Sequence, residues 1–152
     1  MNTPARRRFI SVLAGLAAVP LLPVRVVRAQ SDPFAPLVRE FTGGAPVAAG
    51  RVTVDTPRLA DNGHSVPLRI RVESPMTAID HVRRVTLLSE RNPRPVIATF
   101  HLGPQAGRAE VATRVRLNGS QRVLAVAHLS DGSYWSGIAE VEVTESACLD
   151  AT

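Results

Sequence analysis

One seven-residue run constrains the fold of this chain more than any other feature. In residues 66–72 every second side chain is Val, Leu or Ile, and the intervening ones are Pro or Arg. A period of two is typical of a β-strand with one buried face, because successive side chains point to opposite sides of a sheet. The run therefore predicts a half-buried strand.

Further runs of the same kind follow the chain, at 51–54, 82–88, 95–102, 111–117, 123–129 and 138–143. Turn signals separate them: Asp61-Asn62-Gly63, Ser74-Pro75, Asn92-Pro93, Gly103-Pro104, Asn118-Gly119 and Asp131-Gly132. About seven short strands at this spacing predict an all-β fold, an immunoglobulin-like antiparallel β-sandwich.

A short N-terminal helix precedes the strands. Asp32 is a suitable N-cap and Pro33 suits the first helical position, while Gly43-Gly44 ends the helix. An apolar stripe at helical spacing runs between them, formed by Phe34, Leu37, Val38 and Phe41. We expect the stripe to pack on its own domain, with docking of a partner as the alternative.

The first 29 residues resemble a twin-arginine export signal, with Arg6 and Arg7 ahead of Phe9-Ile10. The apolar stretch 12–24 is interrupted by Gly and Pro and is shorter than the roughly 20 residues of a spanning helix. Small residues before Gln30 suit signal peptidase. We expect export to the periplasm and no membrane span after cleavage; an uncleaved anchor is the alternative.

Charge argues against nucleic acid as a partner. The first 28 residues hold five of the 18 basic residues and no acidic one, which leaves 13 arginines against 13 acidic residues in the rest. The body of the chain is therefore neutral, and it has no basic run and few aromatic residues. The sequence contains no Lys, which excludes lysine nucleophiles and Schiff bases.

Cys148 is the single cysteine, so no internal disulfide is expected. No His lies near it in sequence to act as a base, and the flanking Glu145 and Asp150 oppose thiolate formation. The four histidines are not spaced as a local metal clamp, and neither a nucleophile elbow nor a phosphate loop is present. The sequence predicts no metal, no cofactor and no catalysis by this chain alone.

The order of many short motifs resembles the SoxY family. The matching segments are Asn62-Gly63, Val66-Pro67, Ser74-Pro75-Met76-Thr77, Asp80-His81-Val82, Asn92-Pro93, Ala98-Thr99-Phe100, residues 113–117, Ser120-Gln121, residues 125–127, 130–135 and 141–144. The resemblance implies a sandwich domain over 30–144 and a flexible tail over 145–152 that carries Cys148. It also implies pairing with a SoxZ-like subunit.

In this family the C-terminal cysteine carries sulfur intermediates of periplasmic thiosulfate oxidation between enzymes that load and unload it. Cys148 has the family spacing from Thr144, but the glycines that usually flank the cysteine are replaced by Ser146, Ala147 and Leu149. Glycines keep such an arm thin and flexible. The substitutions therefore affect the delivery of the cargo to partner enzymes more than its attachment to Cys148.

The resemblance favours a sulfur carrier that holds its cargo covalently on Cys148. The alternative is a scaffold subunit in which Cys148 is a spectator; a thiol enzyme is disfavoured for want of a base. Residues 131–135 predict a hairpin turn with packed aromatic residues, and Pro75-Met76 a bend at a strand end. A partner interface is the alternative for both, or for 131–135 a place under the carrier arm.

Overall fold

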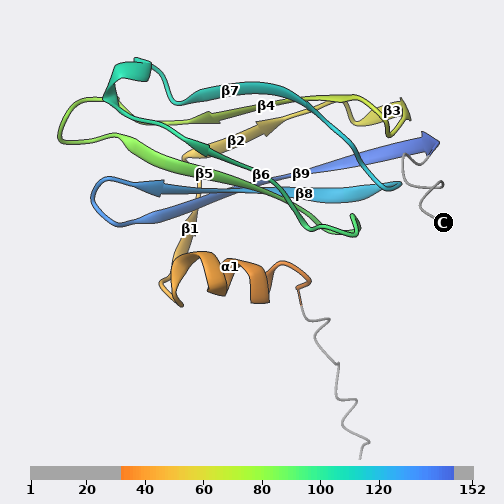
Figure 1. Cartoon of the computed structure of the whole chain (residues 1–152), viewed down its shortest axis with the longest axis horizontal. Helices are drawn as coiled ribbons and strands as arrows, with labels where there is room; N and C mark the ends of the chain where they lie inside the picture. The colour runs from red at the N-terminus through yellow and green to blue at the C-terminus, as the bar shows by residue number, and fades with distance from the viewer. Residues whose placement is uncertain (1–31, 146–152) are drawn as a thin grey trace, which may run out of the picture. The chain divides into compact units, whose positions relative to one another are not determined.

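The computed structural model describes residues 32–145. They form one α-helix, one 3₁₀ turn and nine strands (Figure 1). In chain order these are α1 (Ala35–Thr42), β1 (Val47–Ala49), β2 (Val52–Asp55), β3 (Leu59–Asn62), β4 (Val66–Val72), β5 (Val82–Ser89), β6 (Val96–His101), η1 (Pro104–Ala106), β7 (Glu110–Val115), β8 (Gln121–Leu129) and β9 (Tyr134–Glu145).

The strands form two sheets. The larger has the order β1-β9-β8-β5-β6, with β3 also paired to β9, and the smaller has the order β2-β4-β7. Neighbours are antiparallel except for the two short strands β1 and β3, which run parallel to β9. The predicted all-β sandwich with a short N-terminal helix is confirmed, with two more strands than expected.

The core lies between the sheets. The alternating side chains of β4 that were expected inside, from Val66 to Val72, are all buried there, and the arginines between them are exposed. Val123, Ala125 and Ala127 of β8 face them from the larger sheet. Burial of this apolar surface is the main stabilising contribution to the domain.

Helix α1 covers the outer face of the larger sheet (Figure 1). Phe34 is 1% exposed and packs with Leu88, Leu124 and Val126. The apolar stripe thus packs on its own domain, as expected. It also explains why β8 is apolar on both faces: one face meets the core and the other meets α1.

The predicted start of α1 is wrong by two residues. The helix begins at Ala35 after Phe34 at the N-cap position, with Pro36 in the first turn. Asp32 instead accepts a 3.3 Å hydrogen bond from the Phe34 amide in the preceding turn. The C-terminal end is as expected, because Gly43 has a positive φ of 63° and its amide bonds to Arg39.

The segment from β1 to β3 crosses between the sheets, since β1 and β3 pair with β9 whereas β2 pairs with β4. The crossing is tight at Gly137 of β9. A Cβ atom there would lie 2.8 Å from the carbonyl carbon of Val52. Only glycine leaves room for this backbone approach. Within residues 32–145 no helix is long and apolar enough to cross a membrane.

Candidate functional site

The predicted site residues lie outside the described part of the chain. Cys148 is three residues beyond Glu145, and Arg6 and Arg7 belong to the N-terminal segment. Three residues span at most about 11 Å when extended. The Cα atom of Cys148 therefore lies within that distance of Glu145, at the end of β9.

The end of β9 is held by its backbone. Glu145 pairs with Asn62 of β3, and its carbonyl accepts a 2.7 Å hydrogen bond from the Gly63 amide. The Gly63 carbonyl in turn accepts a 2.9 Å hydrogen bond from the amide of Leu117, in the loop between β7 and β8. Two successive hydrogen bonds thus connect the last residue of β9 to a second loop.

Ser120 provides a further tie to β9. Its hydroxyl accepts a 2.9 Å hydrogen bond from the Val143 amide and donates a 3.3 Å hydrogen bond to the Val143 carbonyl. One side chain therefore satisfies both backbone groups of a residue close to the strand end. The arm that carries Cys148 starts from a fixed base.

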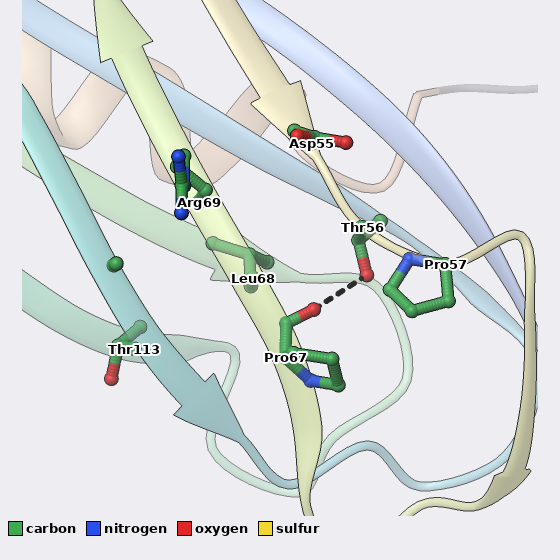
Figure 2. A pocket seen from close by; sticks show the side chains of 8 residues that line it. Asp55, Thr56, Pro57, Pro67, Leu68, Arg69 and Thr113 are labelled. Carbon is green, nitrogen blue, oxygen red and sulfur yellow. Dashed lines mark hydrogen bonds between the residues drawn. The ribbon is translucent and has the colours of Figure 1, made fainter.

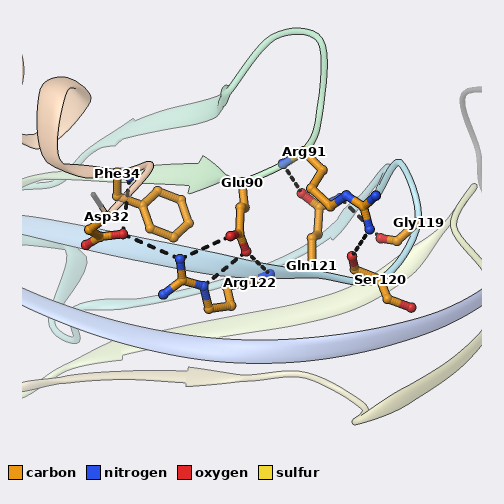
Figure 3. A network of polar contacts seen from close by, with 8 residues as sticks. All are labelled: Asp32, Phe34, Glu90, Arg91, Gly119, Ser120, Gln121 and Arg122. Carbon is orange, nitrogen blue, oxygen red and sulfur yellow. Dashed lines mark hydrogen bonds and ion pairs between the residues drawn. The ribbon is translucent and has the colours of Figure 1, made fainter. Parts of the chain in front are cut away.

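The loop between β5 and β6 joins the same end of the sandwich through Asn92. The Asn92 side chain accepts hydrogen bonds from the Asn118 amide and from Gln121 Nε2, both at 2.9 Å, and donates to the Arg116 carbonyl at 2.8 Å. Arg91 donates its amide to Gln121 and its guanidinium to the Ser120 carbonyl, as Figure 3 shows. The network fixes both loops beside the base of the arm.

A charged pair lies next to this network (Figure 3). Arg122 contacts Glu90 through Nε at 3.0 Å and Nη2 at 3.1 Å, and its guanidinium lies 3.5 Å from Asp32. Hydrogen bonds from Arg122 lower the pKa of Glu90, and Glu90 raises the pKa of Arg122. The guanidinium also lies 5.4 Å from the Phe34 ring centroid, which links the start of α1 to the sheet.

The remaining cations of these loops include Arg94 and Arg116. Both are exposed, and they line a hollow of about 390 Å³ together with Asn92, Pro93, Val96 and Ile97. Arg114 is at the same end, where its guanidinium donates to the backbone and hydroxyl of Ser65 at 3.2 Å. The end of the sandwich from which the arm leaves is therefore rich in arginine.

Comparison with known protein families gives one match for this chain. The family model described as "Sulfur oxidation protein SoxY" matches residues 38–148, and its last matched residue is Cys148. This chain belongs to the SoxY family. No curated protein sequence matches the chain.

Solved structures agree on the fold. The sulfur carrier protein SoxY from Chlorobium limicola f thiosulfatophilum is 21% identical, with a TM-score of 0.63 over 76% of this chain and 99% of that chain. A superoxide reductase (neelaredoxin) from Ignicoccus hospitalis is 17% identical, with a TM-score of 0.55 over 62% of this chain and 80% of its own. At these identities the likeness concerns the fold alone.

The described part of this SoxY-family chain has no cluster of three or more His, Cys, Asp or Glu side chains suited to a metal. His128 stacks on Tyr134 with ring centroids 4.5 Å apart. His81 Nδ1 lies 3.1 Å from the Thr77 carbonyl, at the start of β5. These two histidines thus have structural contacts within the sandwich.

The outer face of the smaller sheet carries a hollow of about 410 Å³, which Figure 2 shows. Thr56 Oγ1 donates a 3.0 Å hydrogen bond to the Pro67 carbonyl across it. Arg69 lies 3.3 Å from Glu110, with the two side chains 49% and 33% exposed. Cross-strand ion pairs of this kind are typical of a solvated sheet face and contribute little to stability.

The two interface candidates are turns within the domain. The hairpin prediction is confirmed: Asp131 accepts hydrogen bonds from the Ser133 amide at 2.8 Å and hydroxyl at 2.7 Å, and Gly132 has a positive φ of 84°. The aromatic residues do not form one packed pair, because Tyr134 packs on the outer cluster and Trp135 on the core.

The hairpin lies far from Glu145, the last residue that the structure describes. It begins β9, whereas the arm follows Glu145 at the other end of this 12-residue strand, roughly 35 Å away. At the other candidate, Met76 is 5% exposed with a positive φ of 52°, and its sulfur accepts a 3.4 Å hydrogen bond from Val82. This is the predicted bend after β4.

Sequence reasoning missed the base of the arm. Gly63 and Asn92 appeared only as turn residues and as part of the SoxY pattern, and Ser120 only as part of that pattern. Their roles depend on contacts with residues between 23 and 82 positions away. The available signal was that polar turn residues from three separate loops all belong to the family pattern.

Proposed function

We propose that this SoxY-family chain is a periplasmic sulfur carrier that holds intermediates of thiosulfate oxidation covalently on Cys148. The observation that carries the proposal is the family match, which extends to Cys148 as its last residue. The similar SoxY from Chlorobium limicola f thiosulfatophilum is named a sulfur carrier protein. The same reasoning assigns loading and unloading of the thiol to separate enzymes.

The geometry supports attachment at a fixed place. The base of the arm is tied by Gly63 and Ser120, and only three residues separate Glu145 from Cys148. A thiol on so short a segment remains close to one end of the sandwich. An enzyme that docks against this end meets the thiol in a narrow range of positions, which lowers the entropy lost on docking.

Export and partnership complete the proposal. Arg6 and Arg7 direct the folded chain through the twin-arginine route to the periplasm, with cleavage before Gln30. A SoxZ-like subunit is the expected partner and travels with it. The proposed partner is supported by family membership, and the proposed export by the sequence of the N-terminal segment.

The test is the intact mass of the mature protein isolated from its host during growth on thiosulfate. We expect added mass that corresponds to sulfane sulfur or a thiosulfonate, is removed by reductant, and is absent from the Cys148→Ser variant. The same measurement reports the N-terminus, and cleavage before Gln30 supports export. A thiol that remains unmodified throughout growth, with thiosulfate oxidation unaffected by Cys148→Ser, would favour the scaffold role instead.

A variant with glycines restored beside Cys148 tests attachment of the cargo and its delivery to partner enzymes separately. Ala147→Gly and Leu149→Gly together return the residues beside Cys148 to the family pattern. If Leu149 obstructs a partner channel, unloading by the enzymes of a family member with the glycine ending accelerates in this variant while loading is unchanged. Equal unloading rates would show that the bulkier residues are tolerated.

A further inference from the structure

The hollow beside the base of the arm brings two arginines together from different loops. Arg94 belongs to the loop between β5 and β6, and Arg116 to the loop between β7 and β8; both line the same space of about 390 Å³. Val96 and Ile97 supply an apolar wall. The two loops are joined by the hydrogen bond of 2.8 Å from Asn92 Nδ2 to the Arg116 carbonyl.

This hollow has a fixed position relative to Glu145 at the end of β9. Arg116 directly precedes Leu117, whose amide donates to the Gly63 carbonyl at 2.9 Å, and the Gly63 amide donates to the Glu145 carbonyl at 2.7 Å. Leu117 is therefore connected to Glu145 through a single residue, Gly63, and its two backbone hydrogen bonds. Since Cys148 is within about 11 Å of Glu145, a group on its sulfur can reach back toward these loops.

The charge of the hollow is not neutralised by the described residues. Neither the Arg94 nor the Arg116 guanidinium has a hydrogen bond or ion pair within residues 32–145. The carboxylate in the same loop, Glu90, is bound to Arg122. A guanidinium remains charged at all physiological pH values, and its planar set of donors matches the oxygens of an oxoanion.

We propose that the hollow between Arg94 and Arg116 is an oxoanion site that receives the terminal sulfonate group of the sulfur species carried on Cys148. The inference rests on the proposed function, and it assigns the site a ligand class: an anionic sulfur oxide linked through sulfur. Holding the sulfonate against the domain retains the cargo between enzymes.

The first experiment tests the hollow without the thiol. Thiosulfate is titrated into the Cys148→Ser protein, and the Nε–Hε resonances of the arginines are followed by NMR. We expect saturable shifts of Arg94 and Arg116, and an affinity about tenfold lower in Arg94→Gln and in Arg116→Gln. Arg108→Gln is the matched control, because Arg108 is an exposed arginine at the opposite end of β7. Absence of these shifts overturns the proposal.

The second experiment loads the thiol chemically. The Cys148 thiolate attacks a central sulfur of tetrathionate; a new S–S bond leaves a thiosulfonate on the protein, and thiosulfate departs with the electron pair of the broken bond. We expect loading to shift the same two resonances and to weaken binding of free thiosulfate about tenfold, since the site is already occupied.

The outcomes of the two experiments are distinguishable. In one outcome, the protein mass shows complete loading of Cys148, but the NMR resonances of Arg94 and Arg116 do not shift. This result overturns the proposal that the hollow receives the cargo carried on Cys148, even if the hollow binds free thiosulfate. A thiol that accepts no sulfur from tetrathionate counts against the proposed function itself, and with it against this inference. Shifts in both experiments, absent from the double Arg94→Gln and Arg116→Gln variant, support the site.

Discussion

The backbone amide of Gly63 donates a 2.7 Å hydrogen bond to the carbonyl of Glu145, the last residue of β9. This contact ends the parallel pairing of β3 with β9 and sets the point from which the arm extends. The proposed carrier role depends on such a fixed origin, because the reach of a three-residue arm is only as well defined as its base.

Ser120→Ala tests how the base is held. The variant loses both hydrogen bonds between the Ser120 hydroxyl and Val143. We expect the Val143 amide to exchange with solvent about fivefold faster, which corresponds to roughly 1 kcal/mol for a single hydrogen bond. Hydrogen exchange measured by NMR gives the rates. Ser136→Ala, in the first half of β9, is the control and should leave Val143 unchanged; equal exchange in all three proteins would contradict this role of Ser120.

Gly137→Ala tests the crossing of β2 over β9. The new Cβ atom would lie 2.8 Å from the carbonyl carbon and 3.2 Å from the Cβ of Val52, so the backbone must move. We expect a loss of about 2–3 kcal/mol in the free energy of unfolding, measured in urea. The neighbouring Ile138→Ala, at a side chain that is 52% exposed, should change it by less than about 1 kcal/mol. Similar losses in the two variants would argue against the close approach.

Glu90→Gln tests the charged pair through its pH dependence. Hydrogen bonds from Arg122 lower the pKa of Glu90 below its usual value of 4.5, so the folded state holds the charged carboxylate more strongly than the unfolded chain does. This stabilisation is present above about pH 4.5 and is lost as the pH falls through the lower pKa of the folded state.

We therefore expect Glu90→Gln to lower the free energy of unfolding by about 1 kcal/mol at pH 7. The difference from the wild type should narrow below pH 4.5. Urea unfolding at pH 7 and at pH 3.5 measures both values. A difference that is constant across this range would mean that the carboxylate charge is not what stabilises the pair.

His128→Phe tests a histidine held beside an aromatic ring. Burial, then the charges of Arg84 and Arg83, lower the pKa of His128 below 6.5. As the pH falls through 6.5 the unfolded chain takes up a proton that the folded state resists, so wild-type stability decreases there. The variant keeps the stack on Tyr134 and should lack this decrease between pH 7.5 and 5.5. His101→Gln, at an exposed strand residue, should retain it.

Periodicity predicted the strands that have one exposed face. The alternation in residues 66–72 gave β4 its observed bounds, and the hairpin between β8 and β9 followed from Asp131-Gly132. These features arise from neighbouring residues along the chain, so a sequence alone contains their cause.

The short strands β1 and β3 were missed for a physical reason. β3 includes Asp61 and Asn62, which are turn residues by preference, and β1 is a three-residue segment with two exposed alanines. Both are strands only because β9 offers them a partner in parallel register. The cationic hollow has the same origin, since Arg94 and Arg116 meet through a hydrogen bond between loops that are distant in sequence.

The long strand β9 has a mechanical consequence for a carrier. It is bonded to β8 over residues 134–141 and to β3 over residues 142–145. Under the proposed carrier role, an enzyme that pulls on a bound Cys148 applies its force to the C-terminal end of β9. The component of that force along the axis of β9 acts on the whole strand. Hydrogen bonds perpendicular to that axis are loaded in shear, all together, and cannot be opened one after another. The domain can thus resist tension at the one point where its partners would apply it.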